Sequence, residues 1–120
     1  MKKILVVDDS PTITNMLRSK LSEAGYNVIA AFDGMQGVMF AHRNEPDLII
    51  LDYKMPAGDG ASVADKIRLS SKTQHIPIIV FSAEDMDKII STLQSKGINH
   101  FVKKPDVDAL LVNVKEIVGE

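Results

Sequence analysis

Carboxylates stand directly after two apolar stretches of this 120-residue chain. Asp8 and Asp9 follow "KKILVV", and Asp52 follows "DLIIL". A hydroxyl, Ser82, and an ammonium group, Lys104, stand in the same way at the ends of two later apolar stretches. An all-oxygen cluster without histidine or cysteine suits a hard cation such as Mg²⁺, which prefers carboxylate ligands. The pattern therefore predicts a magnesium site at the three aspartates, with Lys104 supplying a further positive charge.

Each of these residues also has an ordinary structural explanation when it is taken alone. Asp9 or Ser10 could simply cap a helix, and Asp52 could be a turn residue. Ser82 could likewise cap the helix that follows it, and Lys104 could be a solvated surface lysine. Their shared position favours a site, because all lie at the carboxyl ends of predicted strands, where a doubly wound sheet forms its crevice.

Five short apolar stretches predict the strands that position these residues. They cover residues 3–8, 26–31, 47–52, 76–82 and 98–103. Three of them are nearly continuous rather than alternating, as expected for strands that are covered on both faces. The segments between them carry apolar residues at helical spacing, including 34–44 and 60–71, where glycines lower the helix propensity.

Capping residues indicate where several of the helices begin and end. Ser10 can cap the first helix, Pro11 suits its first position, and Gly25 follows its end. Asp106 is the candidate cap of the last helix, and the apolar residues of the fourth helix lie within 86–93. Five strands and five helices in strict alternation predict an α/β fold, with a doubly wound, mostly parallel sheet and helices on both faces.

Composition sets limits on the class of protein. With 45% hydrophobic and 25% charged residues, we expect residues 1–120 to form a single domain with its own core. The net charge of −2 and the scattered basic residues argue against direct nucleic-acid binding. The chain has no cysteine, which excludes disulfides and thiolate sites. The first apolar run is too short for a signal peptide or membrane span, so we expect a cytoplasmic protein without membrane insertion.

The motifs resemble the receiver domains of two-component response regulators, particularly small stand-alone ones of the chemotaxis type. The resemblance covers essentially the whole chain and rests on "LVVDDSP", "DLIILDYKMPAGDG", "IPIIVFSAE" and "GINHFVKKP". It implies a (βα)5 flavodoxin-like fold whose five-stranded parallel sheet has the strand order 2-1-3-4-5. It also implies one receiver domain over residues 1–120, acting as a phosphorylation-dependent signalling switch and not as an enzyme on other substrates.

The same resemblance implies roles for the acidic residues. Asp52 matches the phosphoacceptor, a carboxylate nucleophile that forms an aspartyl-phosphate. Asp8 and Asp9 match the pair that holds Mg²⁺ together with Asp52, Asp9 directly and Asp8 through water. The backbone carbonyl at Lys54 would complete the protein ligands of the metal.

Further residues match those that respond to the phosphoryl group. Ser82 matches the hydroxyl that bonds a phosphoryl oxygen, and Lys104 matches the lysine that neutralises another and precedes a cis proline. Phe101 matches an aromatic switch residue that turns inward, although a lone strand aromatic is also a common core residue. The implied output is a changed surface on the fourth helix, fifth strand and fifth helix. The implied partners are a sensor histidine kinase or phosphotransfer protein and a downstream target protein.

Three other functions are alternatives to a phosphorylated receiver. An aspartyl-phosphate phosphatase or phosphotransferase typically carries an acid two residues after the nucleophile, where this chain has Lys54. A flavin-binding electron carrier needs a hydroxyl- and glycine-rich phosphate loop where this chain has "DDSPTITN", whose carboxylates would repel the anion. A receiver-like interaction module that phosphorylation does not regulate stays open.

Two charged residues flank the expected approach of water to the phosphoacceptor. Lys54 lies two residues beyond Asp52, and Glu84 lies two residues beyond Ser82. A salt bridge between Lys54 and Glu84 would shield the acyl phosphate from water. The hypothesis that follows is slow self-dephosphorylation.

Overall fold

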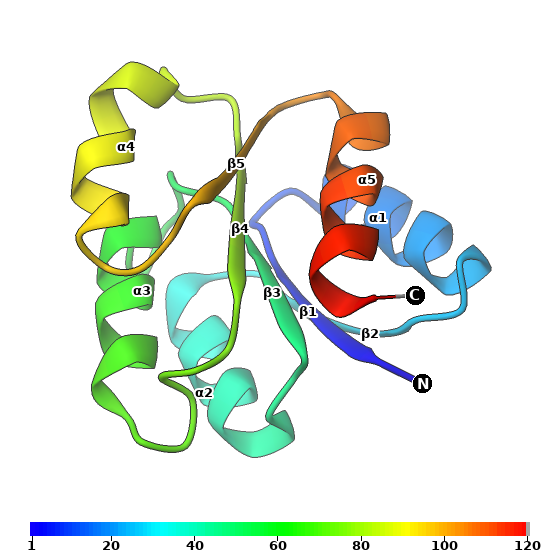
Figure 1. Cartoon of the computed structure of the whole chain (residues 1–120), viewed down its shortest axis with the longest axis horizontal. Helices are drawn as coiled ribbons and strands as arrows, with labels where there is room; N and C mark the ends of the chain where they lie inside the picture. Colours follow the sequence, from blue (N-terminus) through cyan, green and yellow to red (C-terminus); the bar gives the residue numbers. More distant parts are fainter. Residues whose placement is uncertain (120) are drawn as a thin grey trace.

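The structure, a computed structural model, describes residues 1–119 and shows strands and helices in strict alternation (Figure 1). The strands are β1 (Lys3–Val7), β2 (Asn27–Ala31), β3 (Leu48–Leu51), β4 (Ile78–Ser82) and β5 (His100–Lys103). The helices are α1 (Pro11–Glu23), α2 (Gly34–Asn44), α3 (Gly60–Leu69), α4 (Met86–Gln94) and α5 (Val107–Val118). Each lies where the sequence predicted it, but the strands are one or two residues shorter than expected, and α3 ends two residues before the predicted end of 60–71. None of the helices described is long and apolar enough to span a membrane.

All five strands run parallel in one sheet with the order β2-β1-β3-β4-β5, which confirms the predicted topology. The strand order reverses between β1 and β3, which are hydrogen-bonded neighbours although they are not consecutive in the chain. At the carboxyl ends of these strands, Val7 is paired with Leu51. The residues that follow, Asp8 and Asp52, therefore leave the sheet side by side at its topological switch point.

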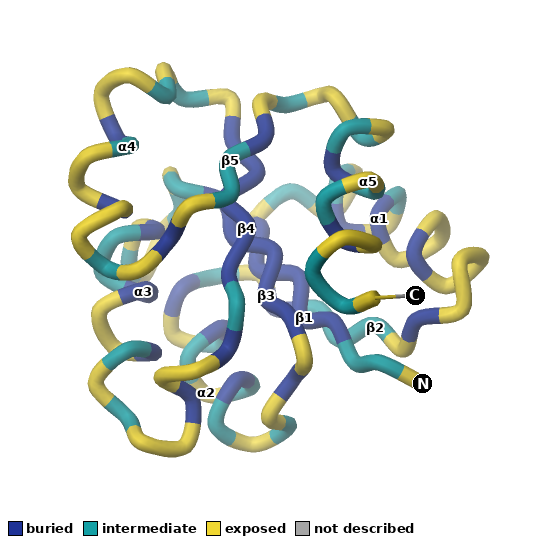
Figure 2. The backbone as a smooth tube through the Cα atoms, in the orientation of Figure 1, coloured by how far each residue is buried: buried dark blue, intermediate teal, exposed yellow. Residues whose placement is uncertain are grey.

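Helices cover both faces of the sheet: α1 and α5 lie on one side, and α2, α3 and α4 lie on the other (Figure 1). Successive strand residues point to opposite faces. Leu5 and Val7 therefore join the core under α2, α3 and α4, whereas Ile4 and Val6 join the core under α1 and α5. The central strands are buried along their length (Figure 2), as the continuous apolar stretches predicted.

Side chains that accept hydrogen bonds from the first turn begin each helix. Ser10 caps α1 and Asp106 caps α5, as the sequence predicted. Asp33 caps α2 in the same way. The cap of α4 is Asp85, so Ser82 does not have the helix-capping role that it could have had. This leaves Ser82 at the end of β4, facing the crevice that the other strand ends form.

Candidate functional site

Three carboxylates meet above the carboxyl ends of β1 and β3. Oxygen atoms of Asp8, Asp9 and Asp52 all lie within 4.8 Å of one another. Asp8 and Asp52 are buried, with 2% and 7% of their surface exposed, whereas Asp9 is exposed. The structure therefore brings together the three aspartates that the sequence placed at strand ends, and two of them have little access to water.

Lys104 inserts its ammonium group between the two buried carboxylates. Its Nζ lies 2.8 Å from Asp8 Oδ2 and 3.2 Å from Asp52 Oδ2, and its side chain is only 15% exposed. Burial on its own would lower the pKa of Lys104, but the hydrogen bond to Asp8 and the charges of Asp52 and Asp8 outweigh it. The pKa of Lys104 is consequently raised, so this side chain remains an ammonium ion at neutral pH.

The pKa of Asp52 is raised above its ordinary value of 3.8. The largest cause is burial, which removes water from the carboxylate, and the charge of Asp8 adds to the effect. Lys104 lowers this pKa by charge and hydrogen bonding, and the Ser82 hydroxyl acts in the same direction, but together they do not cancel the rise. The cluster therefore retains more negative charge than Lys104 alone can compensate.

Backbone amides and one buried hydroxyl hold the acidic residues in place. Ser10 N donates to Asp8 Oδ1 at 3.0 Å, and Tyr53 N donates to Asp52 Oδ1 at 2.8 Å. The hydroxyl of Thr14, which is fully buried, donates to the backbone carbonyl of Asp8 at 3.2 Å. The sequence pattern did not predict these supporting hydrogen bonds. A polar residue on the apolar face of α1 was the available signal for Thr14.

Ser82 is buried at the end of β4, and its Oγ accepts a hydrogen bond from Glu84 N at 3.2 Å. The loop that follows is held at the surface by Lys103, whose Nζ donates to Glu84 O at 3.1 Å. The expected ion pair is present, with 3.9 Å between Lys54 Nζ and Glu84 Oε1. Its side chains are 85% and 37% exposed, so it lies at the rim of the crevice and not inside it.

The loop between β3 and α3, which contains Lys54, packs closely against the start of α2. Gly34 N donates to Pro56 O at 3.4 Å, and a side chain at Gly34 would clash with the carbonyls of Ala57 and Gly58. Gly58 has φ +106, a conformation that residues with side chains rarely adopt. This conformation accounts for a glycine within the "MPAGDG" motif, and it sets the course of the loop beside Asp52.

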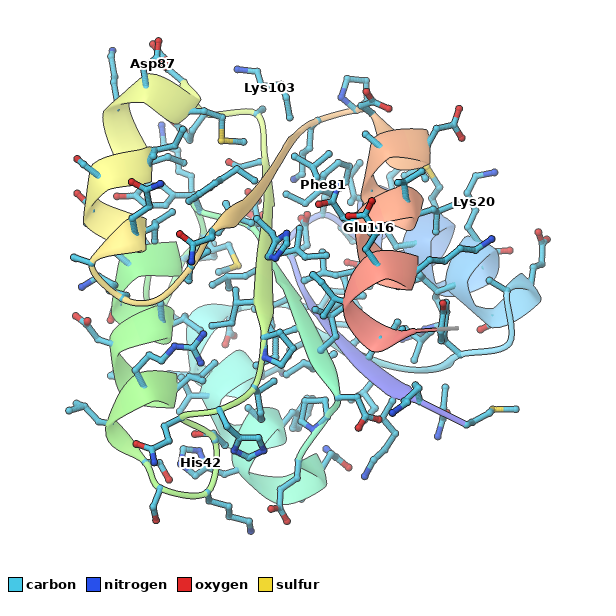
Figure 3. The ribbon with its side chains drawn as sticks, in the orientation of Figure 1. Lys20, His42, Phe81, Asp87, Lys103 and Glu116 are labelled. Carbon is cyan, nitrogen blue, oxygen red and sulfur yellow. The ribbon has the colours of Figure 1, made fainter. Side chains whose placement is uncertain are left out.

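Aromatic residues lie on both sides of the last two strands. Phe81 packs on the α5 side of β4 (Figure 3), and Lys104 Nζ lies 6.0 Å from the centre of its ring. Phe101 is half-buried in β5 and packs against the core under α3 and α4. The Lys104–Pro105 peptide bond is cis, as the resemblance implied. The inward turn expected of Phe101 stays a prediction.

Comparison with known proteins identifies the family. The response regulator receiver domain matches residues 4–115. The chain belongs to the response regulator receiver family. Receivers are signalling modules, so neither the phosphatase nor the flavin-carrier alternative is supported.

Solved structures of other receivers share the fold over nearly their whole length. The chemotaxis protein CheY4 of Vibrio cholerae is 30% identical, with a TM-score of 0.91 and 98% of each chain covered. The receiver domain of the sensor histidine kinase PA1611 of Pseudomonas aeruginosa is 29% identical, with a TM-score of 0.88 and 99% of this chain and 98% of that chain covered. A magnesium ion is coordinated in the active-site cleft of that domain.

A curated relative is longer than this receiver. The DNA-binding dual master transcriptional regulator RpaA of Synechocystis is 34% identical over 98% of this chain, but only 49% of that protein is matched. The receiver therefore spans about half the length of this relative, and the comparison concerns the receiver portion alone.

The donor set of this receiver fits a hard divalent cation. Asp8, Asp9 and Asp52 offer carboxylate oxygens close enough to share one ion, without a nitrogen or sulfur ligand. The exposed position of Asp9 opens the cluster to solvent on one side. The raised pKa of Asp52 indicates that an added positive charge would favour the ionised carboxylate.

Proposed function

We propose that this receiver accepts a phosphoryl group on Asp52 from a sensor histidine kinase or phosphotransfer protein. The change at Asp52 then alters the surface of α4, β5 and α5 and thereby the binding of a downstream target protein. The observation that carries the proposal is the position of Lys104, which bridges Asp8 and Asp52 at the switch point of the sheet. A buried carboxylate beside a fixed ammonium group is a suitable place for a developing phosphoryl charge.

The metal belongs to the same proposal. Asp8, Asp9 and Asp52 would hold Mg²⁺, and the backbone carbonyl of Lys54 would complete the protein ligands. When bound, the ion supplies positive charge that neutralises the phosphoryl oxygens. The support in this receiver is the all-oxygen cluster and its uncompensated negative charge.

Asp52 supplies the nucleophile. One carboxylate oxygen forms the new P–O bond while the P–N bond to the donor phosphohistidine breaks, and the imidazole leaves with the electron pair of that bond. The amide of Tyr53 holds the other oxygen of Asp52 at 2.8 Å, which fixes the orientation of the carboxylate. Lys104 is already adjacent and offers a charge-assisted hydrogen bond to a phosphoryl oxygen.

Ser82 and Phe101 would transmit the change to the surface. Phosphorylation adds about −1.5 to −2 charge and three acceptor oxygens. The Ser82 hydroxyl, buried at the neighbouring strand end, would rotate to donate to one of those oxygens and pull on the loop before α4. Phe101, two strands from Asp52 on the sheet edge, would turn inward as that loop moves. Both steps follow the switching roles that the sequence implied.

Intact mass spectrometry after incubation with acetyl phosphate tests the proposal. We expect a base-labile phosphoryl gain in the presence of Mg²⁺, its loss with excess chelator, and its loss in Asp52→Asn. Asp108→Asn, which makes the same chemical change at an exposed position of α5, should retain the gain. The absence of any gain in the wild type would refute the proposal and favour the interaction module that phosphorylation does not regulate.

We also propose that residues 1–120 form one receiver unit and that this receiver is cytoplasmic, as expected from the sequence. DNA binding is a property of the longer Synechocystis relative. For this chain, the net charge of −2 and the scattered basic residues argue against direct nucleic-acid binding.

A further inference from the structure

Arg68, in the last turn of α3, donates hydrogen bonds to three backbone carbonyls outside its own helix. Its Nε bonds Lys96 O at 2.9 Å, and its Nη1 bonds Gln74 O at 2.9 Å and Ile76 O at 2.7 Å. The guanidinium thereby joins the end of α3, the segment that leads into β4, and the turn after α4. Burial lowers the pKa of Arg68, and no ion pair offsets this cost within residues 1–119, so the carbonyl groups compensate the charge.

The turn after α4 is shaped to present its carbonyl to Arg68. Gly97 has φ +75, and Ile98 N donates to Leu93 O at 3.1 Å, which ends the helix in a tight left-handed turn. Leu93 and Ile98 are fully buried, so the turn is seated in the core. The carbonyl of Lys96, which accepts from Arg68, lies just beyond the C-terminal, negative end of α4, where a guanidinium is favoured.

A second contact holds the same turn from α3. Lys96 Nζ lies 2.6 Å from Asp65 Oδ1, with the lysine side chain 18% exposed. Asp65 lies one turn before Arg68 on α3. Both the backbone and the side chain of Lys96 are therefore held by α3. We name these three residues, Asp65, Arg68 and Lys96, the Arg68 anchor.

The opposite end of α4 is held by fewer long-range polar contacts, although Ile89 in its first turn is buried in the core. Its cap, Asp85, is exposed, and the Asp85 side chain accepts a hydrogen bond from Asp87 N at 3.1 Å. The preceding loop is held by the exposed Lys103, and Figure 3 places Asp87 and Lys103 along the same outer edge of the molecule. Glu84 in this loop donates its amide directly to Ser82 Oγ. The N-terminal end of α4 is therefore linked to the phosphorylation crevice, whereas the C-terminal end is fixed on α3.

We propose that the Arg68 anchor is the pivot of the switch. A phosphoryl-linked movement of Ser82 tilts the N-terminal end of α4, while the C-terminal end stays in place on α3. Arg68 is a positioning residue in this device, because its contacts are made to Gln74, Ile76 and Lys96 and not to the acidic cluster. The pivot rests on the proposed function, since it requires a phosphoryl group at Asp52 to move the loop.

Hydrogen–deuterium exchange on the full chain tests the pivot, with Mg²⁺ and beryllofluoride as a stable stand-in for the phosphoryl group. In the wild type we expect beryllofluoride to change exchange about tenfold within residues 83–90 and less than about twofold within 93–98. Arg68→Gln should speed exchange within 93–98 about tenfold without beryllofluoride, and should let the beryllofluoride response spread along the whole helix. Lys66→Gln removes the same charge from the exposed face of α3 and should behave as the wild type.

Two further variants keep the test decisive if Arg68→Gln folds poorly. Arg68→Lys retains the charge but lacks the fork that reaches several carbonyls, so it should give an intermediate increase within 93–98. Asp65→Asn removes only the outer contact with Lys96 and should give a smaller increase. Wild-type exchange rates within 93–98 in both of these variants would overturn the anchor.

The failure of the pivot and the failure of the proposed function give different results. A wild-type response spread evenly over α4, with normal phosphorylation by acetyl phosphate, would overturn the pivot alone. No response to beryllofluoride anywhere, together with no phosphoryl gain on Asp52, would overturn the proposed function and the pivot that depends on it.

Discussion

The ammonium nitrogen of Lys104 lies 2.8 Å from a carboxylate oxygen of Asp8 and 3.2 Å from one of Asp52. Removing this cation would leave two buried carboxylates without their compensating charge. We expect Lys104→Met to lower the free energy of unfolding by about 2–4 kcal/mol in chelator, as measured by urea denaturation. Lys88→Met, at an exposed position of α4, should change it by less than about 0.5 kcal/mol. Equal stabilities of the two variants would contradict the structural role of Lys104.

The contribution of Lys104 to stability should disappear at high pH. Its pKa in the folded chain is raised above the ordinary value of 10.5, which describes the unfolded chain. Its stabilising contribution is therefore fully present below pH 10.5 and is lost as the pH rises through the higher folded pKa. The stability difference between the wild type and Lys104→Met should be constant near neutrality and shrink only in this alkaline range. A stability difference between the two proteins that grows with pH in the alkaline range would contradict a raised pKa of Lys104.

Asp52→Asn should stabilise the metal-free chain at pH 7. Since the pKa of folded Asp52 is raised, this residue favours folding below its ordinary pKa of 3.8, and that contribution is lost as the pH rises through the folded value. The neutral amide removes the penalty of the buried charge, by on the order of 1 kcal/mol in urea denaturation with chelator. The gain should shrink as the pH falls through the raised pKa of folded Asp52, and it should be absent below pH 3.8. Destabilisation at pH 7, with Asp108→Asn unchanged, would show that the charge of Asp52 is fully compensated.

Asp9 allows the metal site to be tested apart from the fold, because it is exposed while Asp8 and Asp52 are buried. Mg²⁺ at about ten times its dissociation constant should stabilise the wild type by about 1.4 kcal/mol. Asp9→Asn should lose most of this gain, while its stability in chelator stays within about 0.5 kcal/mol of the wild type. Thermal unfolding with and without Mg²⁺ measures both quantities. A full Mg²⁺ response in Asp9→Asn would remove Asp9 from the ligands.

The sequence predicted the fold, and it predicted that the acidic side chains at the strand ends would lie together, because both depend on where apolar stretches end. Asp8, Asp52 and Ser82 all follow from that one pattern, since parallel strands bring their carboxyl ends to one edge. The hydrogen bonds that hold these side chains in place could not be predicted from that pattern. The amides of Ser10 and Tyr53 reach the carboxylates only because of the loop conformation, which side-chain types do not encode.

The end of α3 and the role of Arg68 show where sequence patterns stop being informative. The predicted helix 60–71 ends at Leu69, because Thr73 Oγ1 donates to Ile67 O at 2.7 Å and closes the helix from the following segment. In the sequence, a basic residue on a predicted helix that binds backbone carbonyls cannot be distinguished from one that points into solvent. The carbonyls that Arg68 binds come from segments far apart in the sequence and converge only in the folded chain.

The ion pair of Lys54 and Glu84 lies at the rim of the crevice, on the expected path of water to a phosphoryl group on Asp52. Its atoms are 3.9 Å apart and its side chains are 85% and 37% exposed, so solvent screens it strongly. A pair of this kind contributes at most about 1 kcal/mol, which limits its effect on hydrolysis to roughly fivefold. We expect Lys54→Ala with Glu84→Ala to shorten the phosphoryl lifetime within that limit, as measured by loss of the phosphorylated mass over time. Lys88→Ala, which removes an exposed lysine of α4, is the control. An unchanged lifetime in the double variant would show that this ion pair does not shield the acyl phosphate.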